Sequence, residues 1–256
     1  MREPGRSVVG GLSASGSKPT YEGVVAEHRA YVGALRAAGA QVMVLPPLEA
    51  FPDSVFVEDP ALVFAAGAIR LRPGAPSRRD EARELAPALE ARFPRVLTLS
   101  DGFADGGDVL VTPREVLIGL SARTDAAGAA ALARLLDSLG FAARVVDVPA
   151  GTLHLKTDCS LVDEETILAT PTLAASGLLG GYRLLVVPDE ERHATNALRI
   201  NDVVLMRDGC PRTRELLERH GLAVRPLPTD EIAKIDAGLS CMSLRWFDPQ
   251  LRFGLG

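Results

Sequence analysis

Three kinds of side chain in this sequence could together do covalent chemistry: a cysteine, a histidine and a group of carboxylates. Cys241 follows a turn at 237–238 within an apolar run, and His154 lies between two leucines. The carboxylates gather upstream, in the segments FPDSVFVED (51–59) and DGGD (105–108). A thiolate is a strong nucleophile, and an imidazole can give up a proton and then take one back. The combination predicts covalent chemistry on a cationic substrate.

The composition limits the class of protein. The chain has 256 residues, of which 47% are hydrophobic, and this is enough to bury one large core. Its formal net charge of −5 provides no basic surface, so nucleic acid is not an expected partner. It has no apolar run of about 18 to 20 residues, the length of a membrane span, and its first residues lack the apolar core of a signal peptide. We expect a soluble, cytoplasmic protein without a membrane partner.

The cysteines are too few and too widely spaced for a disulfide framework or a structural zinc site. Cys159, Cys210 and Cys241 show no CxxC spacing. We interpret Cys159 and Cys210 as small buried side chains, because free cysteine behaves as a small hydrophobe. Cys241 remains the candidate nucleophile.

A repeated pattern organises the chain. Short apolar segments that end at turns predict five strands, at 41–46, 95–99, 144–149, 182–188 and 222–228. Amphipathic patterns before four of them predict helices at 21–38, 79–93, 126–139 and 211–220, whereas the stretch before the 182–188 strand, 173–181, is short and rich in glycine. After each strand a strand pair is expected, at 61–71, 109–120, 160–169, 197–206 and 239–247. We expect the last segment to pair with 7–9, so that the two ends close a ring.

The repeat also places the polar side chains. A period of about 40 to 50 residues that occurs five times favours a closed array of units over an open sheet. At the entrance to each strand pair stand Asp59, Asp105, His154, Asn196 and Cys241, with successive separations of 46, 49, 42 and 45 residues. If the units surround an axis, these five side chains converge on its mouth.

Seven segments make the sequence similar to a known family. They are FPDSVFVED (51–59), RPGAPSRR (72–79), DGGDVL (105–110), GLSART (119–124), LHLKT (153–157), PRTRE (211–215) and SCMSLR (240–245). On these segments the chain resembles the dimethylarginine dimethylaminohydrolases of the pentein, or guanidino-group modifying, superfamily. The resemblance implies an α/β fold, a pseudo-fivefold, five-bladed α/β propeller, as a single catalytic domain over 1–256, in agreement with the count of five repeats.

The resemblance implies hydrolysis of N-omega-methylated arginine to citrulline and methylamine or dimethylamine. In the mechanism it implies, Cys241 attacks the guanidinium carbon and forms a covalent S-alkylthiouronium intermediate. His154 then protonates the leaving amine and afterwards deprotonates a water molecule. Asp105, where family members carry Glu or Asp, is implied to orient His154 or to pair with the guanidinium. No cofactor is required by this mechanism.

The resemblance also implies a set of substrate contacts. A carboxylate and a planar N–H fork match in geometry, so Asp59 is expected to bind the guanidinium. Asp53 is expected at the substrate's α-amino group, and Glu58 as a support for the lid. Arg78 and Arg123 are expected to bind the substrate's carboxylate together, as a clamp. Leu12 is expected in the lid, the loop that closes over the substrate.

Two further expectations concern partners. The expected binding partner is a small molecule, methylated arginine. The sequence leaves open whether the protein forms a homodimer. Because thiolate and neutral imidazole are preferred zinc ligands, Zn²⁺ is expected to bind at Cys241 and His154 as an inhibitor and not as a cofactor.

Several alternatives remain open at the level of sequence. The same scaffold could act as an arginine or agmatine deiminase, although agmatine lacks the carboxylate that an arginine clamp would bind. A Cys-His-Asp amide hydrolase explains three residues but not the acidic cluster at 53–59. A binding protein without enzymatic activity on the pentein fold would not need Cys241 and His154. The pair Gly106-Gly107 lacks the GxGxxG spacing of a nucleotide-binding loop.

Overall fold

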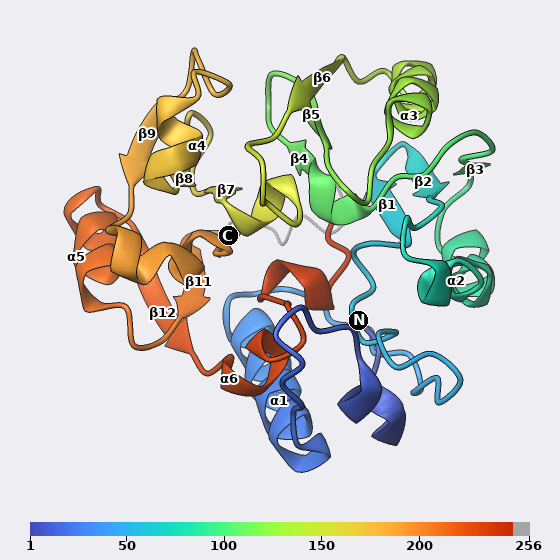
Figure 1. Ribbon diagram of the computed structural model, residues 1–256, viewed down its shortest axis with the longest axis horizontal. Coiled ribbons are helices and arrows are strands. Elements are labelled where there is room, and N and C mark those ends of the chain that lie inside the picture. Colours follow the sequence, from blue (N-terminus) through green and yellow to red (C-terminus); the bar gives the residue numbers. More distant parts are fainter. Residues whose placement is uncertain (248–256) are drawn as a thin grey trace, which may run out of the picture.

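Five units surround a central axis in the computed structural model, which describes residues 1–247 (Figure 1). Four of the units contain a three-stranded sheet with one topology. Two antiparallel strands form a hairpin, and a third strand, reached through a helix, pairs in parallel with the second. The sheets therefore repeat the helix, strand and strand-pair pattern of the sequence, and the predicted pseudo-fivefold architecture is confirmed.

The strands of the four sheets are short. They are β1 (Ala61–Phe64), β2 (Gly67–Arg70), β3 (Val96–Thr98), β4 (Val109–Val111), β5 (Val116–Leu120), β6 (Ala143–Asp147), β7 (Cys159–Leu161), β8 (Thr166–Ala169), β9 (Arg183–Val186), β10 (Leu198–Ile200), β11 (Val203–Arg207) and β12 (Ala223–Leu227). The α-helices are α1 (Tyr21–Ala37), α2 (Glu81–Glu90), α3 (Ala126–Ser138), α4 (Pro171–Ala175), α5 (Pro211–Arg219) and α6 (Asp230–Ala233). Six 3₁₀ helices connect them: η1 (Arg6–Gly10), η2 (Pro76–Arg78), η3 (Gly106–Asp108), η4 (Leu155–Thr157), η5 (Asp189–Thr195) and η6 (Ser240–Met242).

Local signals explain where the long helices begin. The Thr20 hydroxyl accepts a hydrogen bond from the backbone N–H of Gly23, and the Asp125 carboxylate accepts one from Gly128, so α1 and α3 each start at an N-cap. Along α1 the side chains of Val24, Tyr31 and Leu35 are buried, which places one helical face on the core. The predicted 79–93 helix is shorter than expected because 76–78 forms η2 and α2 begins only at Glu81.

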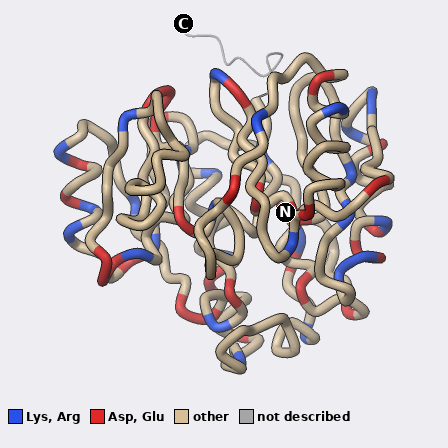
Figure 2. The backbone as a smooth tube through the Cα atoms, turned by 45° about the horizontal axis from the view of Figure 1, so that its top comes forward, with Lys and Arg blue, Asp and Glu red and all other residues tan. Residues whose placement is uncertain are grey.

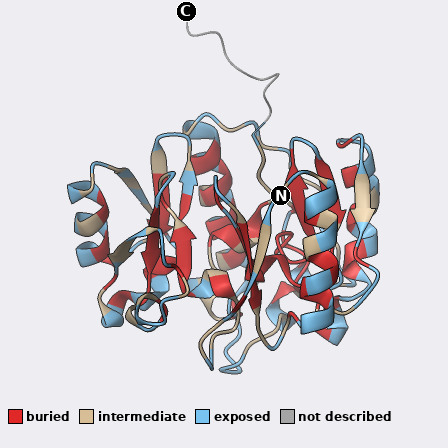
Figure 3. Cartoon of the chain, turned by 90° about the horizontal axis from the view of Figure 1, so that it is seen from above, coloured by how far each residue is buried: buried red, intermediate tan, exposed pale blue. Residues whose placement is uncertain are grey.

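Hydrophobic clusters join each unit to its neighbour. The first sheet packs on the second through residues such as Phe64 and Ile118, and α1 packs on the fourth sheet through Tyr31 and Leu205. Two more clusters lie between the second and third sheets and between the third and fourth. Buried residues occupy the hairpin strands, such as β1 and β8, and the inner helix faces, while the outer helix faces are exposed (Figure 3). The outer parallel strands β3 and β9 contain no buried residue. Burial of this apolar surface is what holds the ring together.

The fifth unit contains α1 and α6 but no sheet in the described residues. Here the prediction that 7–9 would pair with 239–247 is wrong. The segment 7–9 lies in η1, because Glu49 accepts hydrogen bonds from the backbone N–H groups of Arg6 and Ser7, at 2.8 and 2.9 Å, and bends the chain there. Strand-like pairing occurs instead between Arg2 and Leu45, which form a parallel bridge.

The chain still closes the ring at this point. Trp246 packs its ring edge-on against Phe93, with ring centroids 4.9 Å apart, and Leu244 joins Leu45 in the cluster that covers the first sheet. The C-terminal segment of the described chain therefore lies between the fifth and first units. Residues 248–256 of the predicted single domain lie outside the described residues.

Charges of both signs are interspersed along the backbone (Figure 2). Within residues 1–247, no helix combines the length and the hydropathy needed to cross a membrane.

Candidate active site

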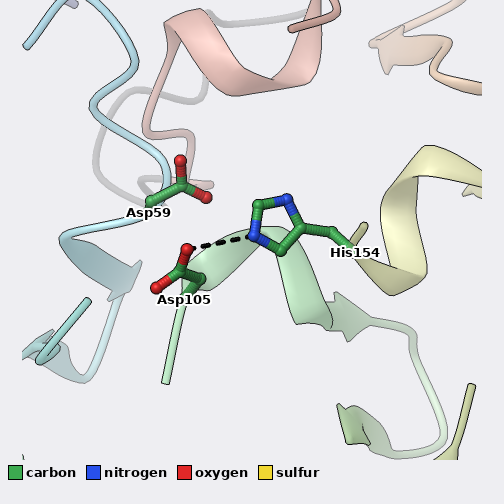
Figure 4. A group of neighbouring side chains, drawn as sticks. All are labelled: Asp59, Asp105 and His154. Carbon is green, nitrogen blue, oxygen red and sulfur yellow. Dashed lines mark hydrogen bonds and ion pairs between the residues drawn. The ribbon is translucent and has the colours of Figure 1, made fainter. Parts of the chain in front are cut away.

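The repeated polar positions converge at the axis, as predicted. Asp59 precedes β1, Asp105 precedes η3, and His154 is the N-cap of η4. Figure 4 shows the side chains of these three residues pointing toward one another, and one polar atom of each lies within 4.8 Å of the others. Asp105 Oδ2 lies 3.0 Å from His154 Nε2. Three different units thus contribute one side chain each to a common cluster.

The glycine pair at 106–107 makes this approach possible. A Cβ atom on Gly107 would lie 2.8 Å from the His154 ring, and one on Gly106 would lie 2.0 Å from the carbonyl oxygen of Glu58. The backbone N–H of Gly107 donates to Asp59 Oδ1 at 3.1 Å. The two glycines therefore serve close backbone packing at the axis.

His154 carries a proton at neutral pH. Burial by itself lowers the pKa of the imidazole, but the hydrogen bond to Asp105 and the negative charges of Asp59 and Asp108 outweigh it and raise the pKa to about 9. Asp105 is fully buried, and its other oxygen accepts a hydrogen bond from the backbone N–H of Gly74 at 2.8 Å. Of the two roles expected for Asp105, these contacts match the orientation of His154.

Cys241 lies in η6, at the same mouth. Together with His154 it lines a cavity of about 890 Å³ that opens at this end of the ring. The backbone N–H of Gly238 points at the sulfur from 3.5 Å. Burial, with the nearby charges of Glu58 and Asp59, raises the pKa of the thiol to about 12. These shifts favour the thiol form of Cys241 and the imidazolium form of His154 in the resting protein.

This charge state predicts a steep pH dependence of thiol reactivity. Below the pKa the thiolate fraction, and with it the rate of alkylation, rises about tenfold per pH unit. We expect the alkylation of Cys241 by iodoacetamide to follow this slope between pH 7 and 9, because the thiol pKa lies near 12. Mass spectrometry of the labelled peptide separates Cys241 from Cys159 and Cys210. A rate that is already constant above pH 7 would contradict the protonated resting state.

Glu58 contacts the segment that carries Cys241, and these contacts differ from the lid support expected of it. Its carboxylate binds Lys156 at 2.5 Å and Arg245 at 2.9 Å, and it accepts a hydrogen bond from the Ser240 hydroxyl at 2.8 Å. Its backbone N–H donates to the carbonyl of Cys241 at 3.1 Å. Burial favours the protonated form, but the two cations hold the pKa of Glu58 below its usual range. Within residues 1–247, no hydrogen bond of Glu58 reaches the lid segment.

Asp53 takes the place beside the lid. Its Oδ1 accepts a hydrogen bond from the backbone N–H of Leu12 at 3.0 Å, so Leu12 lies next to the acidic cluster as expected. The same loop continues to Ala14, whose N–H donates to Asp236 at 2.6 Å. Burial raises the pKa of Asp53, while the positive charge of Arg78 opposes the shift. The loop is thus tied both to Asp53 and to the segment that leads to Cys241.

The two arginines expected to form a clamp occupy different environments. Arg78 is buried, forms an ion pair with Asp59, and contacts both oxygens of Glu81 at 2.7 and 3.0 Å. It also donates to the carbonyl of Phe56 at 2.8 Å. Arg123 is half-buried and has no ion pair among the described residues, yet it is close enough to Asp53 to lower its pKa. Of the two arginines, Arg123 is therefore the one whose guanidinium is not paired with a carboxylate in the described part of the chain.

Asp108 is a positioning residue that we did not assign from the sequence. It accepts hydrogen bonds from the backbone N–H of Leu155 at 2.9 Å, from Ser121 at 2.6 Å and from Thr124 at 2.7 Å. The first of these fixes the residue that follows His154. The sequence feature that could have identified Asp108 is its position in the DGGD segment (105–108).

The expected zinc ligand set differs from the group that the structure brings together. Among the described residues, that group is Asp59, Asp105 and His154, and it does not include Cys241. Asp59 already forms an ion pair with Arg78, and Asp105 already pairs with His154. Zinc binding at Cys241 and His154 stays a prediction.

A pseudo-fivefold ring with cysteine, histidine and carboxylates at one mouth defines the pentein, or guanidino-group modifying, class. The family model described as N,N dimethylarginine dimethylhydrolase, eukaryotic, matches residues 14–173. The dimethylarginine dimethylaminohydrolase of Pseudomonas aeruginosa is 38% identical over 96% of this chain and 97% of its own length. That of Streptomyces coelicolor is 36% identical over 84% of this chain and 83% of its own. The chain belongs to the dimethylarginine dimethylaminohydrolase family.

A solved structure supports the same assignment. The Pseudomonas aeruginosa protein, as a cysteine-to-serine mutant complexed with citrulline, superposes with a TM-score of 0.92 at 38% identity, covering 95% of this chain and 96% of that one.

Proposed function

We propose that the protein hydrolyses N-omega-methylated arginines, asymmetric dimethylarginine and monomethylarginine, to citrulline and dimethylamine or methylamine. One observation carries the proposal: His154 shares a cavity with Cys241, beside buried carboxylates that suit a guanidinium. The relative from Pseudomonas aeruginosa is named for this activity, and its mutant binds citrulline.

The proposed reaction uses side chains of the chain and water. The Cys241 thiol first releases its proton to solvent water. The thiolate sulfur then adds to the guanidinium carbon, and the C–N bond to the methylated nitrogen breaks as His154 donates its proton to the departing amine. Because Asp105 holds Nε2, the Nδ1 atom is the one left for this transfer. The neutral imidazole then takes a proton from water, which attacks the S-alkylthiouronium carbon. Citrulline leaves as the C–S bond breaks.

In this proposal, substrate binding favours ionisation of the Cys241 thiol. The negative charges of Glu58 and Asp59 help to keep the thiol protonated in the resting protein. A bound guanidinium brings a positive charge into the same cavity, and an opposite charge nearby favours the thiolate. The thiol therefore ionises after the cation has entered, which limits side reactions of the free enzyme.

The binding groups in this proposal are those that the family resemblance implies, and the contacts of the two arginines support a choice between them. Asp59 binds the guanidinium, Asp53 the α-amino group, and Leu12 covers the substrate from the lid. Arg123 binds the carboxylate, because its guanidinium has no other ion pair in the described part of the chain, whereas Arg78 is engaged by Asp59 and Glu81.

Removal of the Arg123 guanidinium is expected to affect only substrates that carry a carboxylate. A hydrogen bond to a charged group contributes about 1.5 to 3 kcal/mol, so Arg123→Ala should lower kcat/KM for dimethylarginine about tenfold to a hundredfold. Dimethylarginine without its carboxylate should be turned over equally by variant and wild type. Arg134→Ala, an exposed arginine on α3, is the matched control. Equal losses on both substrates would place the carboxylate contact elsewhere.

The proposed function is tested by formation of the ureido product from four substrates in parallel. The product is citrulline from dimethylarginine, monomethylarginine and arginine, and carbamoylputrescine from agmatine. Methylated arginines should react fastest. Faster turnover of arginine would favour a deiminase, an activity for which an arginine deiminase 31% identical over only 50% of this chain provides weak support. Formation of a ureido product from none of them would leave a binding protein on this fold.

A further inference from the structure

Asn196 is the one repeat position at the axis to which the proposed reaction gives no role. It follows η5, it is half-buried, and it lines the same cavity as His154 and Cys241. Its side chain thus lies next to the reacting groups without being one of them.

The carboxamide of Asn196 bridges two segments of the site. Its Oδ1 accepts a hydrogen bond from the backbone N–H of Ser240 at 3.0 Å. Its Nδ2 donates to the Ser240 hydroxyl at 3.2 Å and to the carbonyl of Lys156 at 3.1 Å. Ser240 directly precedes Cys241, and Lys156 follows His154 by two residues. One side chain therefore links the segment of the nucleophile to the segment of the acid.

Asn196 also contacts the turn before the nucleophile. A Cβ atom on Gly238 would lie 2.4 Å from Asn196 Cγ, so glycine at 238 allows the turn to lie directly on the carboxamide. The backbone N–H of that same glycine points at the Cys241 sulfur. The position of the sulfur is thus set, through Gly238 and Ser240, by where Asn196 lies.

The chemistry of these contacts requires an amide. Asparagine offers an acceptor and two donor hydrogens at one end of a short side chain, and all three are used here. Aspartate has the same shape but no donor, so it would face the carbonyl of Lys156 with a second oxygen. Alanine would make none of the three contacts.

We propose that Asn196 is a positioning residue, whose carboxamide fixes the distance between Cys241 and His154; this proposal rests on the proposed function. Small displacements of reacting groups can cost about a hundredfold in rate. Asn196 touches neither the sulfur nor the imidazole in a hydrogen bond, so it acts through Ser240, Gly238 and Lys156.

The test compares Asn196→Ala and Asn196→Asp with the control Asn201→Ala. Asn201 is the other asparagine of the chain, and its Nδ2 also donates to a main-chain carbonyl, that of Ala38, but it does not line the cavity of His154 and Cys241. With dimethylarginine we expect kcat to fall at least about tenfold in both Asn196 variants, with KM within about threefold of wild type, because positioning acts on the reacting groups and not on substrate binding. Asn201→Ala should keep the wild-type kcat.

A second measurement needs no substrate, so it separates failure of this proposal from failure of the proposed function. The rate of Cys241 alkylation by iodoacetamide, followed against pH, should change at least about threefold at a fixed pH in the Asn196 variants and remain unchanged in Asn201→Ala. If wild type forms no citrulline, the proposed function fails. The alkylation profile alone then tests whether Asn196 positions Cys241. Should Asn196→Ala not fold, the isosteric Asn196→Asp decides. Wild-type kcat in a folded Asn196→Asp, or a wild-type alkylation profile in both variants, would overturn the proposal.

Discussion

Cys241→Ser is expected to lower kcat for dimethylarginine at least about a thousandfold, because loss of a covalent nucleophile typically costs several orders of magnitude. A serine hydroxyl is a far weaker nucleophile, and the neighbouring His154 is protonated, with a pKa of about 9, so it cannot act as its base at neutral pH. The measurement is citrulline formation, together with the mass of the protein during turnover. Wild type should carry the thiouronium adduct, and the variant should not.

The matched control is Cys210→Ser. Cys210 is a buried thiol at the N-cap of α5, with no side-chain cap hydrogen bond, and serine is a favoured residue at that position. Its kcat should equal that of wild type. Activity above about a tenth of wild type in Cys241→Ser would remove Cys241 from the nucleophile's role, since uncatalysed attack cannot supply that rate.

Arg78→Ala is expected to lower the free energy of unfolding by about 3 to 5 kcal/mol, the usual cost of removing one partner from a buried ion pair. The substitution leaves the carboxylates of Asp59 and Glu81 buried without their cation. Arg83→Ala, on the neighbouring helix α2, is the control, because Arg83 pairs with Asp80 at 3.2 Å while both side chains are at least 70% exposed. That pair should contribute at most about 0.5 kcal/mol. Urea denaturation measures both variants.

The loss in the free energy of unfolding caused by Arg78→Ala should become smaller at acidic pH. Burial favours the protonated form of Asp59, yet the positive charges around it, that of Arg78 first, hold its folded pKa below the usual range. Its ionised form therefore stabilises the fold above the unfolded pKa of about 3.9, and this contribution disappears as the pH falls through the lower folded pKa. Wild type should approach Arg78→Ala in stability over that range. A variant as stable as Arg83→Ala, but with weak substrate binding, would support the clamp role that the family resemblance implied.

The local sequence determined the units and the positions that face the axis. Apolar periodicity places a helix at 21–38, and the structure has α1 over Tyr21–Ala37. The same repeat aligned Asp59, Asp105 and His154, which come from three units and meet in one cluster. These features follow from short-range patterns, because helix caps, strand alternation and turns are set by residues near each other in the chain.

Only the tertiary structure decided which charged groups pair. Arg78 was expected to form half of a carboxylate clamp, and it is buried against Asp59 and Glu81. Glu58, expected at the lid, binds Lys156 and Arg245 beneath the nucleophile. A buried charge must find a partner of opposite sign, and the choice depends on which groups from distant segments are brought together in the folded ring. The backbone pairing at the N-terminus also depends on a residue distant in the sequence. Glu49 accepts hydrogen bonds from the backbone N–H groups of Arg6 and Ser7, at the start of the segment predicted to form a strand.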